Sequence, residues 1–198
     1  RYPDVQINRA GEEQEQQEFL GKLELYFGIA ILAIYALMAV IFRSYSQPFL
    51  VLAASPFALI GGILGHVLMG MDLSMLSTLG MLACAGVVVN DNVVLIDRIN
   101  QLRAGGISPR IAVIKASVQR FRPIVLTSLT TFFGLMPILL ETSVQAQFLI
   151  PMVASLSFGV LCAMLGTLLF TPCLYLAGDN VKRRLGMARG QAGKPATV

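Results

Sequence analysis

The chain has 198 residues, of which 56% are hydrophobic and only 13% are charged, and its mean hydropathy is +0.72. This balance excludes an ordinary soluble domain and is typical of a polytopic membrane protein. The net charge of +4 does not indicate nucleic acid, because no base-reading motif or aromatic-interleaved basic patch accompanies the basic residues. The three cysteines lie apart in apolar segments without metal or redox spacing, and we interpret them as packing residues.

The first twenty residues are hydrophilic and precede any apolar segment. Residues 2–8 alternate roughly like a strand, whereas residues 11–18 are polar and favour a helix. Twenty such residues cannot build a core of their own, and the chain opens with Arg1 rather than Met. We interpret residues 1–20 as the remnant of an extracytoplasmic domain; the alternative is a disordered acidic leader.

Five apolar segments follow, each long enough or nearly long enough to cross a bilayer as a helix. They cover about residues 23–42, 48–69, 74–96, 123–140 and 148–176. The last is long enough to tilt or bend, and prolines at 56, 137, 151 and 172 are expected to bend the spans. The sequence therefore predicts an all-α fold: a bundle of five transmembrane helices within residues 21–178.

The charges of the connecting segments predict the orientation. Of the 15 lysines and arginines, all but Arg1, Arg9 and Lys22 fall after span one, between spans three and four, or after span five. By the positive-inside rule that side is cytoplasmic, which places the N-terminus in the periplasm and the C-terminus in the cytoplasm.

Two further pieces are expected on the cytoplasmic side. Residues 98–122 form a connector in which Gly105-Gly106 makes a turn and Ser108-Pro109 starts a helix. Apolar and basic residues then alternate, which predicts a short amphipathic helix at the membrane surface, most simply a structural elbow. The basic tail, residues 179–198, is expected to be disordered towards its end.

One ionisable residue, Asp91, lies deep in the third span, between Asn90 and Asn92. A carboxyl inside a span costs about 2.5–3.5 kcal/mol on insertion scales, so it marks a functional site by default. From its separation from Arg98 we place it about 10 Å inside the cytoplasmic boundary. Ser77, Gly80, Cys84, Val87 and Asp91 share one helix face, which we expect to point into the bundle, with the two asparagines donating hydrogen bonds to the carboxylate.

The fourth span offers hydroxyl partners for this carboxyl. Thr127, Thr130, Thr131 and Gly134 occupy one helix face, and Thr127 lies about 7.5 Å deep, in the same layer as Asp91. Such hydroxyls could hold a proton path, or could simply bond to their own backbone. His66, the single histidine, fits a buried polar contact or an interfacial residue better than a proton relay, and Asp97 fits a solvated pair with Arg98.

Three motifs carry a resemblance to a known family. They are FRSYSQP at residues 42–48, GVVVND at residues 86–91 and RFRPIVLTSL at residues 120–129. In the sequence and order of these motifs, the chain resembles the resistance–nodulation–division (RND) permeases. The resemblance extends over residues 1–178 and is to the AcrB-type hydrophobe/amphiphile efflux pumps. The resemblance implies the last five helices of a twelve-helix permease, with residues 1–20 ending the second periplasmic porter loop.

The resemblance also implies a function and a site. It implies proton-driven multidrug or amphiphile efflux across the bacterial inner membrane, with Asp91, Asn90, Thr127 and Arg120 in the proton relay. Residues expected to support them are Asn92, Thr131 and Ser128. The drug pumps carry a lysine where this chain has Asn90, so the charge balance at Asp91 must differ here. The family's essential aspartate pair lies in the first half, so this chain alone should not pump.

The implied partners are the N-terminal half of the permease, two further copies in a homotrimer, a periplasmic adaptor, an outer-membrane channel and amphiphilic substrates. We expect no cofactor, no metal and no enzymatic activity, because no nucleophile–base pair, metal set or nucleotide loop is present. The alternatives are an accessory of protein translocation of the SecD/SecF type and a non-transport scaffold or sensing module.

Overall fold

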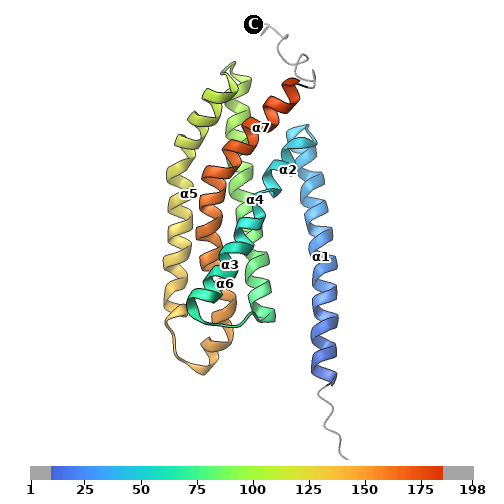
Figure 1. Ribbon diagram of the computed structural model, residues 1–198, viewed down its shortest axis with the longest axis vertical. Helices are drawn as coiled ribbons and strands as arrows, with labels where there is room; N and C mark the ends of the chain where they lie inside the picture. Colours follow the sequence, from blue (N-terminus) through green and yellow to red (C-terminus); the bar gives the residue numbers. More distant parts are fainter. Residues whose placement is uncertain (1–9, 185–198) are drawn as a thin grey trace, which may run out of the picture.

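The computed structural model describes residues 10–184, and these form a helical bundle (Figure 1). In chain order the elements are α1 (Ala10–Phe42), α2 (Ser46–Leu52), α3 (Ser55–Met69), α4 (Met75–Ala104), α5 (Pro109–Leu139), α6 (Val144–Leu165), the π-helix η1 (Gly166–Phe170) and α7 (Thr171–Arg184). The helical propensity of residues 11–18 is confirmed, because α1 already begins at Ala10. The strand expected at residues 2–8 and the end of the basic tail lie outside the described residues.

The described residues contain five helical segments long and apolar enough to cross a membrane. They are Gly21–Phe42, Ser46–Met69, Met75–Ala104, Pro109–Leu139 and Val144–Val181. The all-α fold is therefore confirmed for the described residues, and five helical segments have the length and composition that the predicted spans require. Two of the spans are composite: α2 and α3 share the second, while α6, η1 and α7 share the fifth.

The break in the second span has a local cause. Pro56 has no backbone N–H, so it cannot bond to the carbonyl of Leu52 as a continuing helix would require. The chain accordingly leaves α2 after Leu52 and restarts as α3 at Ser55, with Pro56 in the first turn. In contrast, Pro123, Pro137 and Pro151 lie inside continuous helices.

The structure corrects the predicted connector. The helical residues of segment 98–122 do not form a separate surface helix, because α4 runs on to Ala104 and α5 runs without interruption from Pro109. The predicted helix start at Ser108-Pro109 is right. The amphipathic segment that follows continues into the membrane span, because no helix-terminating residues separate the two. The connection itself is the short turn 105–108, in which Gly106 adopts a positive φ of 81°.

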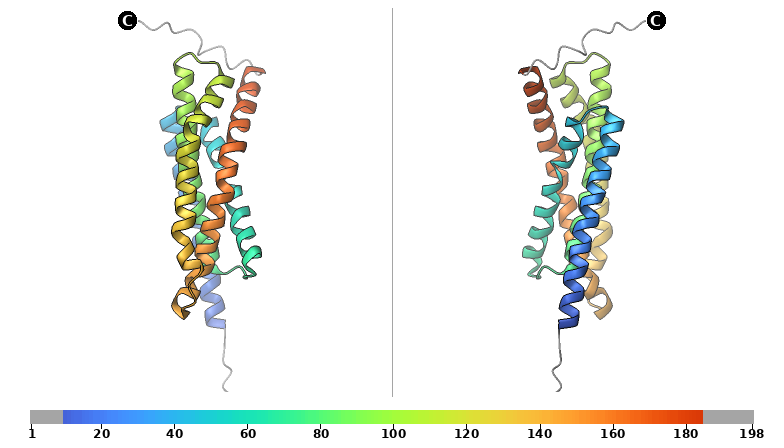
Figure 2. Two further views of the ribbon diagram at one scale, coloured as in Figure 1. Left: turned by 90° about the vertical axis from the view of Figure 1, so that its left-hand side faces the viewer. Right: turned by 90° about the vertical axis from the view of Figure 1, so that its right-hand side faces the viewer.

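Helix α6 packs against α3, α4 and α5, whereas α1 stands to one side (Figures 1 and 2). Of the most apolar 18-residue stretch of α1, which lies within Gly21–Phe42, only 6% is buried. Its link to the bundle is the elbow into α2, where Met38 joins a core cluster with Val51, Leu95 and Tyr175. In this elbow Arg43 has a positive φ of 47°, and the Tyr35 hydroxyl donates to the Tyr45 carbonyl over 2.9 Å.

Glycines allow α3, α4 and α6 to approach closely. A Cβ atom at Gly80 would collide with the Met152 carbonyl oxygen, and one at Gly61 would lie 2.6 Å from the Phe158 carbonyl oxygen. These obstacles are backbone atoms, which cannot move aside as a flexible side chain can. Small residues at such contacts are the usual means of packing helices in lipid.

We expect Gly80→Ala to destabilise the bundle by about 1–3 kcal/mol, the usual cost of overpacking. The matched control is Gly86→Ala on the same helix, where an added Cβ meets nothing within 4 Å. The measurement is thermal unfolding of the 198-residue chain in detergent, in a Cys162→Ser, Cys173→Ser background, followed by a thiol-reactive dye that reaches the buried Cys84 only on unfolding. Equal midpoints for the two variants would contradict the close packing of α4 on α6.

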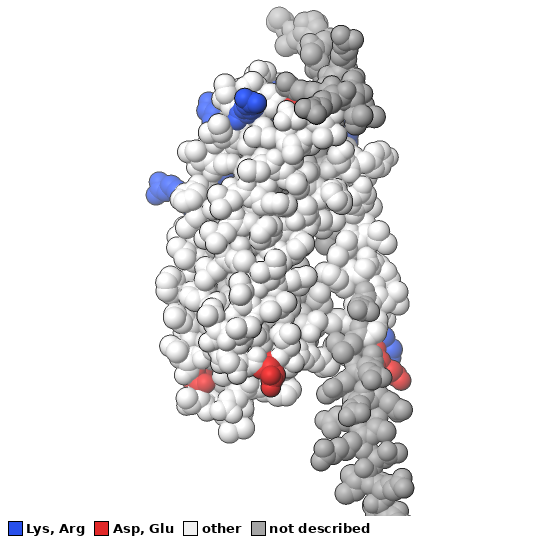
Figure 3. All heavy atoms as spheres, in the orientation of Figure 1, with Lys and Arg blue, Asp and Glu red and all other residues white. Residues whose placement is uncertain are grey.

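Charged side chains gather at the two ends of the molecule (Figure 3). On the face shown, basic side chains lie in the upper part, the lower end carries mainly acidic ones, and the surface between them is uncharged. The positive-inside rule was applied to this distribution of charge. The orientation in the membrane stays a prediction.

Candidate functional site

The buried face of α4 is a stripe of small and apolar residues with one amide in it. Along the helix the stripe consists of Ser77, Gly80, Cys84, Val88, Asn92, Leu95 and Ile99. The predicted face is therefore correct over its first half and wrong over its second, where Val88 and Asn92 replace Val87 and Asp91. Steps of three and four residues both fit a helix of 3.6 residues per turn, so the sequence pattern could not distinguish these neighbours.

Asp91 is half-buried, next to this stripe. Within the described part of the chain its carboxylate forms no hydrogen bond and no ion pair. The two asparagines that were expected to donate to it do not do so: Asn90 is exposed, and the amide of Asn92 points to other helices. A carboxyl inside a span without a partner requires a proton, water or a group from outside these residues.

The hydroxyl groups of α5 bond to their own helix. Thr127 donates to the Pro123 carbonyl over 2.9 Å, and Thr131 donates to the Thr127 carbonyl over 2.8 Å. Thr127 is exposed and Thr131 is half-buried, so the predicted hydroxyl face lies largely outside the bundle and does not contact Asp91 by a hydrogen bond. Of the other predicted residues, Ser128 is buried and Arg120 is half-buried on α5.

Inside the bundle, Asn92 makes polar contacts with two other helices that the sequence analysis did not predict. Asn92 is fully buried and accepts a hydrogen bond of 2.8 Å from the Thr171 hydroxyl, while its amide donates to the Val51 carbonyl over 3.5 Å. It thereby joins α4 to α2 and to the first residue of α7. The only signal for Thr171 in the sequence is a hydroxyl next to Pro172 within an apolar segment.

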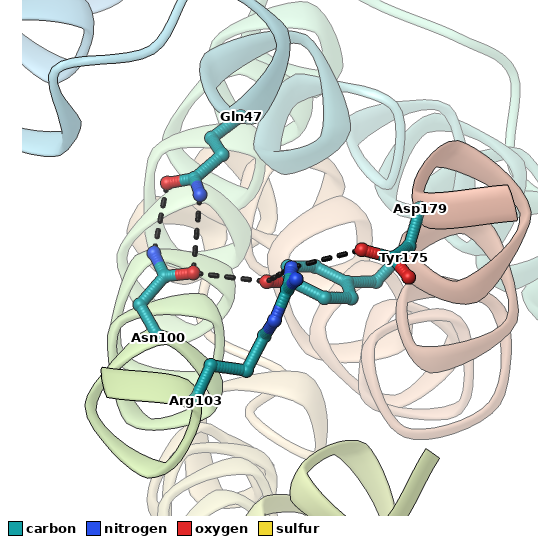
Figure 4. Close-up of polar contacts among 5 residues, drawn as sticks. All are labelled: Gln47, Asn100, Arg103, Tyr175 and Asp179. Atoms are coloured by element: carbon teal, nitrogen blue, oxygen red, sulfur yellow. Dashed lines mark hydrogen bonds and ion pairs between the residues drawn. The ribbon is translucent and has the colours of Figure 1, made fainter. Parts of the chain in front are cut away.

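A second polar network ties the same three helices at the basic end (Figure 4). Gln47 and Asn100 exchange two amide hydrogen bonds of 3.0 and 2.8 Å, and the Tyr175 hydroxyl donates to the Asn100 carbonyl oxygen over 3.0 Å. Arg103 contacts the Tyr175 hydroxyl at 3.2 Å and forms an ion pair of 3.0 Å with Asp179. All of these residues except Asn100 border a cavity of about 650 Å³ between the α1–α2 elbow and α7.

His66 is the buried polar contact that the sequence favoured. Its Nδ1 lies 2.9 Å from the Gly62 carbonyl, which can only accept, so Nδ1 carries the proton. The Ser77 hydroxyl then donates to Nε2 over 2.7 Å, and Ser77 in turn takes part in the capping box at the start of α4. Both ring nitrogens are thus satisfied by α3 and by the start of α4.

The described residues form a helical bundle with five segments long and apolar enough to cross a membrane, an architecture typical of a multi-pass membrane protein. Comparison with known proteins agrees: the profile of the AcrB/AcrD/AcrF family matches residues 2–178. The chain belongs to this family, which lies within the RND efflux permeases.

Two relatives illustrate the similarity. The multidrug resistance protein MdtC of Proteus mirabilis (strain HI4320) is 32% identical over 176 residues, which are 88% of this chain and 17% of that protein. The crystal structure of a heavy metal efflux pump superposes with a TM-score of 0.73 at 25% identity, over 85% of this chain and 16% of the pump. This chain therefore spans about a sixth of the length of each.

Proposed function

We propose that these residues are the C-terminal transmembrane portion of a proton-driven permease that exports hydrophobic or amphiphilic small molecules. The observation that carries the proposal is Asp91, a half-buried carboxyl in a membrane helix that has no partner within the described part of the chain. Such a group can take up and release a proton as its surroundings change. Family membership and the multidrug relative supply the transport context.

The partner for Asp91 is the remaining, N-terminal half of the permease. Gly86 and Asn90 form an exposed stripe on α4, and Thr127, Thr130 and Gly134 are exposed on α5. Small and polar residues facing lipid are unfavourable, whereas they are typical of helix–helix contacts inside a membrane. We place the second half against these residues, where it would supply the charge that a lysine at position 90 supplies in the drug pumps.

The proposal includes the assembly and the orientation. The permease lies in the bacterial inner membrane with the N-terminus of this chain in the periplasm, works as a homotrimer, and exports through a periplasmic adaptor and an outer-membrane channel. Neither a translocation accessory of the SecD/SecF type nor a non-transport scaffold is favoured by the family match.

The test is export by the full-length transporter that contains these residues. It is expressed in a bacterial strain without its own efflux pumps, and the release of a preloaded amphiphilic dye is followed by fluorescence. We expect dye release that stops when a protonophore collapses the proton gradient. Release that persists without a proton gradient would contradict proton coupling, and no release of any amphiphile tested would contradict the substrate class.

A further inference from the structure

The contact of Asn92 with Thr171 differs from those that the threonines of α5 make. Thr127, Thr130 and Thr131 donate to carbonyls of their own helix, as threonines in membrane helices usually do. The Thr171 hydroxyl instead crosses to the carbonyl oxygen of the Asn92 side chain on α4, over 2.8 Å, and both residues are fully buried.

Both partners of Asn92 lie where the backbone departs from a regular α-helix. Thr171 directly follows η1, and its own N–H bonds to the Gly166 carbonyl five residues earlier, which closes the last wide turn. Val51, whose carbonyl accepts from Asn92, lies one residue before the end of α2 and the break that precedes α3. A π-helical turn inserted in a helix is frequent at functional sites.

Asn92 is the residue directly after Asp91, so the two side chains leave α4 about 100° apart around the helix axis. Contacts to α2 on one side and to α7 on the other fix the Asn92 side chain, and with it the rotation of α4 at this level. A rotation of α4 by one residue position would carry Asp91 into the place that Asn92 fills. The direction in which Asp91 points therefore depends on which partners Asn92 finds.

We propose that Asn92 and Thr171 are positioning residues for Asp91: their hydrogen bond sets the rotation of α4 and so holds the carboxyl at the edge of the bundle instead of inside it. This inference rests on the proposed role of Asp91 as a proton carrier. The hydrogen bond also links the helix that carries this carboxyl to the π-helical turn of the fifth span. A rotation of α4 would therefore be transmitted to α7 through Thr171.

The charged groups next to Asp91 in the chain do not compete for this role. Asp97 accepts a hydrogen bond from Gln101, and Arg98 donates to Gln119 and Gln101. From α2, α5, α6 and α7, no charged side chain within the described residues pairs with Asp91. A change in the reactivity of Asp91 on altering Thr171 would therefore be transmitted through Asn92 and the backbone of α4.

The experiment measures Asp91 directly, without requiring transport. The full-length protein in native membranes is treated with dicyclohexylcarbodiimide, which modifies protonated carboxyls in apolar surroundings, over a range of pH, and labelled Asp91 is quantified by mass spectrometry. The variants are Thr171→Val, which keeps the shape but removes the donor, and Thr171→Ser, which keeps the donor. Ser157→Ala is the control, because the Ser157 hydroxyl is buried with no hydrogen-bond partner in the described structure.

We expect Thr171→Val to move the midpoint of labelling by about half a pH unit or more, and Thr171→Ser and Ser157→Ala to leave it near the wild-type value. Equal midpoints in all four proteins would overturn the positioning role, even if Thr171→Val lowers stability. If Asp91→Asn exports dye normally but the Thr171→Val midpoint shifts, the proposed function fails while the positioning of Asp91 stands.

Discussion

Replacement of Asp91 by asparagine in the full-length transporter is expected to lower dye efflux about a hundredfold at unchanged membrane levels, the low end of what a positioned proton-transfer group contributes. Asparagine keeps the size and polarity of the side chain but cannot take up a proton. Because the carboxyl is half-buried and has no partner among the described residues, its loss breaks no contact within them, and stability should not fall.

The matched control is Asp97→Asn on the same helix. Asp97 lies six residues, about 1.7 turns, nearer the basic end, and it accepts a hydrogen bond of 2.7 Å from Gln101, which an asparagine oxygen can also accept. We expect nearly wild-type efflux from this variant. Wild-type efflux from Asp91→Asn would reduce Asp91 to a tolerated polar residue and leave proton coupling to the other half of the permease.

Replacement of Asn100 by alanine is expected to destabilise the bundle by about 2–4 kcal/mol, because it leaves several partly buried polar groups without partners. Asn100 exchanges two hydrogen bonds with Gln47 and accepts a third from Tyr175, so it joins α4 to α2 and α7. The variant removes these links together, and α2 carries the elbow through which α1 is attached. The measurement is the thermal unfolding midpoint of the 198-residue chain in detergent.

Gln101→Ala serves as the comparison, since Gln101 is the next residue of α4 and its side chain also forms two hydrogen bonds, to Asp97 and Arg98. Those bonds are exposed and lie within one helix, so their loss should cost about 0.5 kcal/mol or less. If the two alanine variants unfold at the same temperature, the amide network between helices adds nothing to the stability of the bundle.

The membrane-length helices, the close helix contacts and the presence of an ionisable group within one of these helices could be predicted from the sequence. Long apolar segments have one stable form in a bilayer, the helix, because only it satisfies every backbone group internally. Ser77, Gly80 and Cys84 marked the buried face of α4 because small residues are what allow helices to approach in lipid. His66 could be recognised as a structural contact because no acid accompanies it in its span.

The details of the polar groups could not be predicted, because they depend on neighbours from distant parts of the chain. Residues 91 and 92 are both polar and both fit the helical period, so the spacing does not show which one is buried. In the structure it is Asn92, which contacts Val51 and Thr171. The hydroxyls of α5 share a face that suggested a relay, but Thr127 and Thr131 bond to their own backbone. Sequence spacing reports which residues share a face, not what that face meets.

The amino-acid sequence was sufficient to predict an all-α bundle with five membrane-length helices and membership of the RND permeases, because hydropathy, charge distribution and short motifs are local properties. The tertiary structure decided which polar side chains meet. It joined Asn92 to Thr171 and Asn100 to Gln47 and Tyr175, pairs that lie 79, 53 and 75 residues apart in the chain. A buried amide or hydroxyl must find a partner, and folding brings α2, α4 and α7 together to provide one.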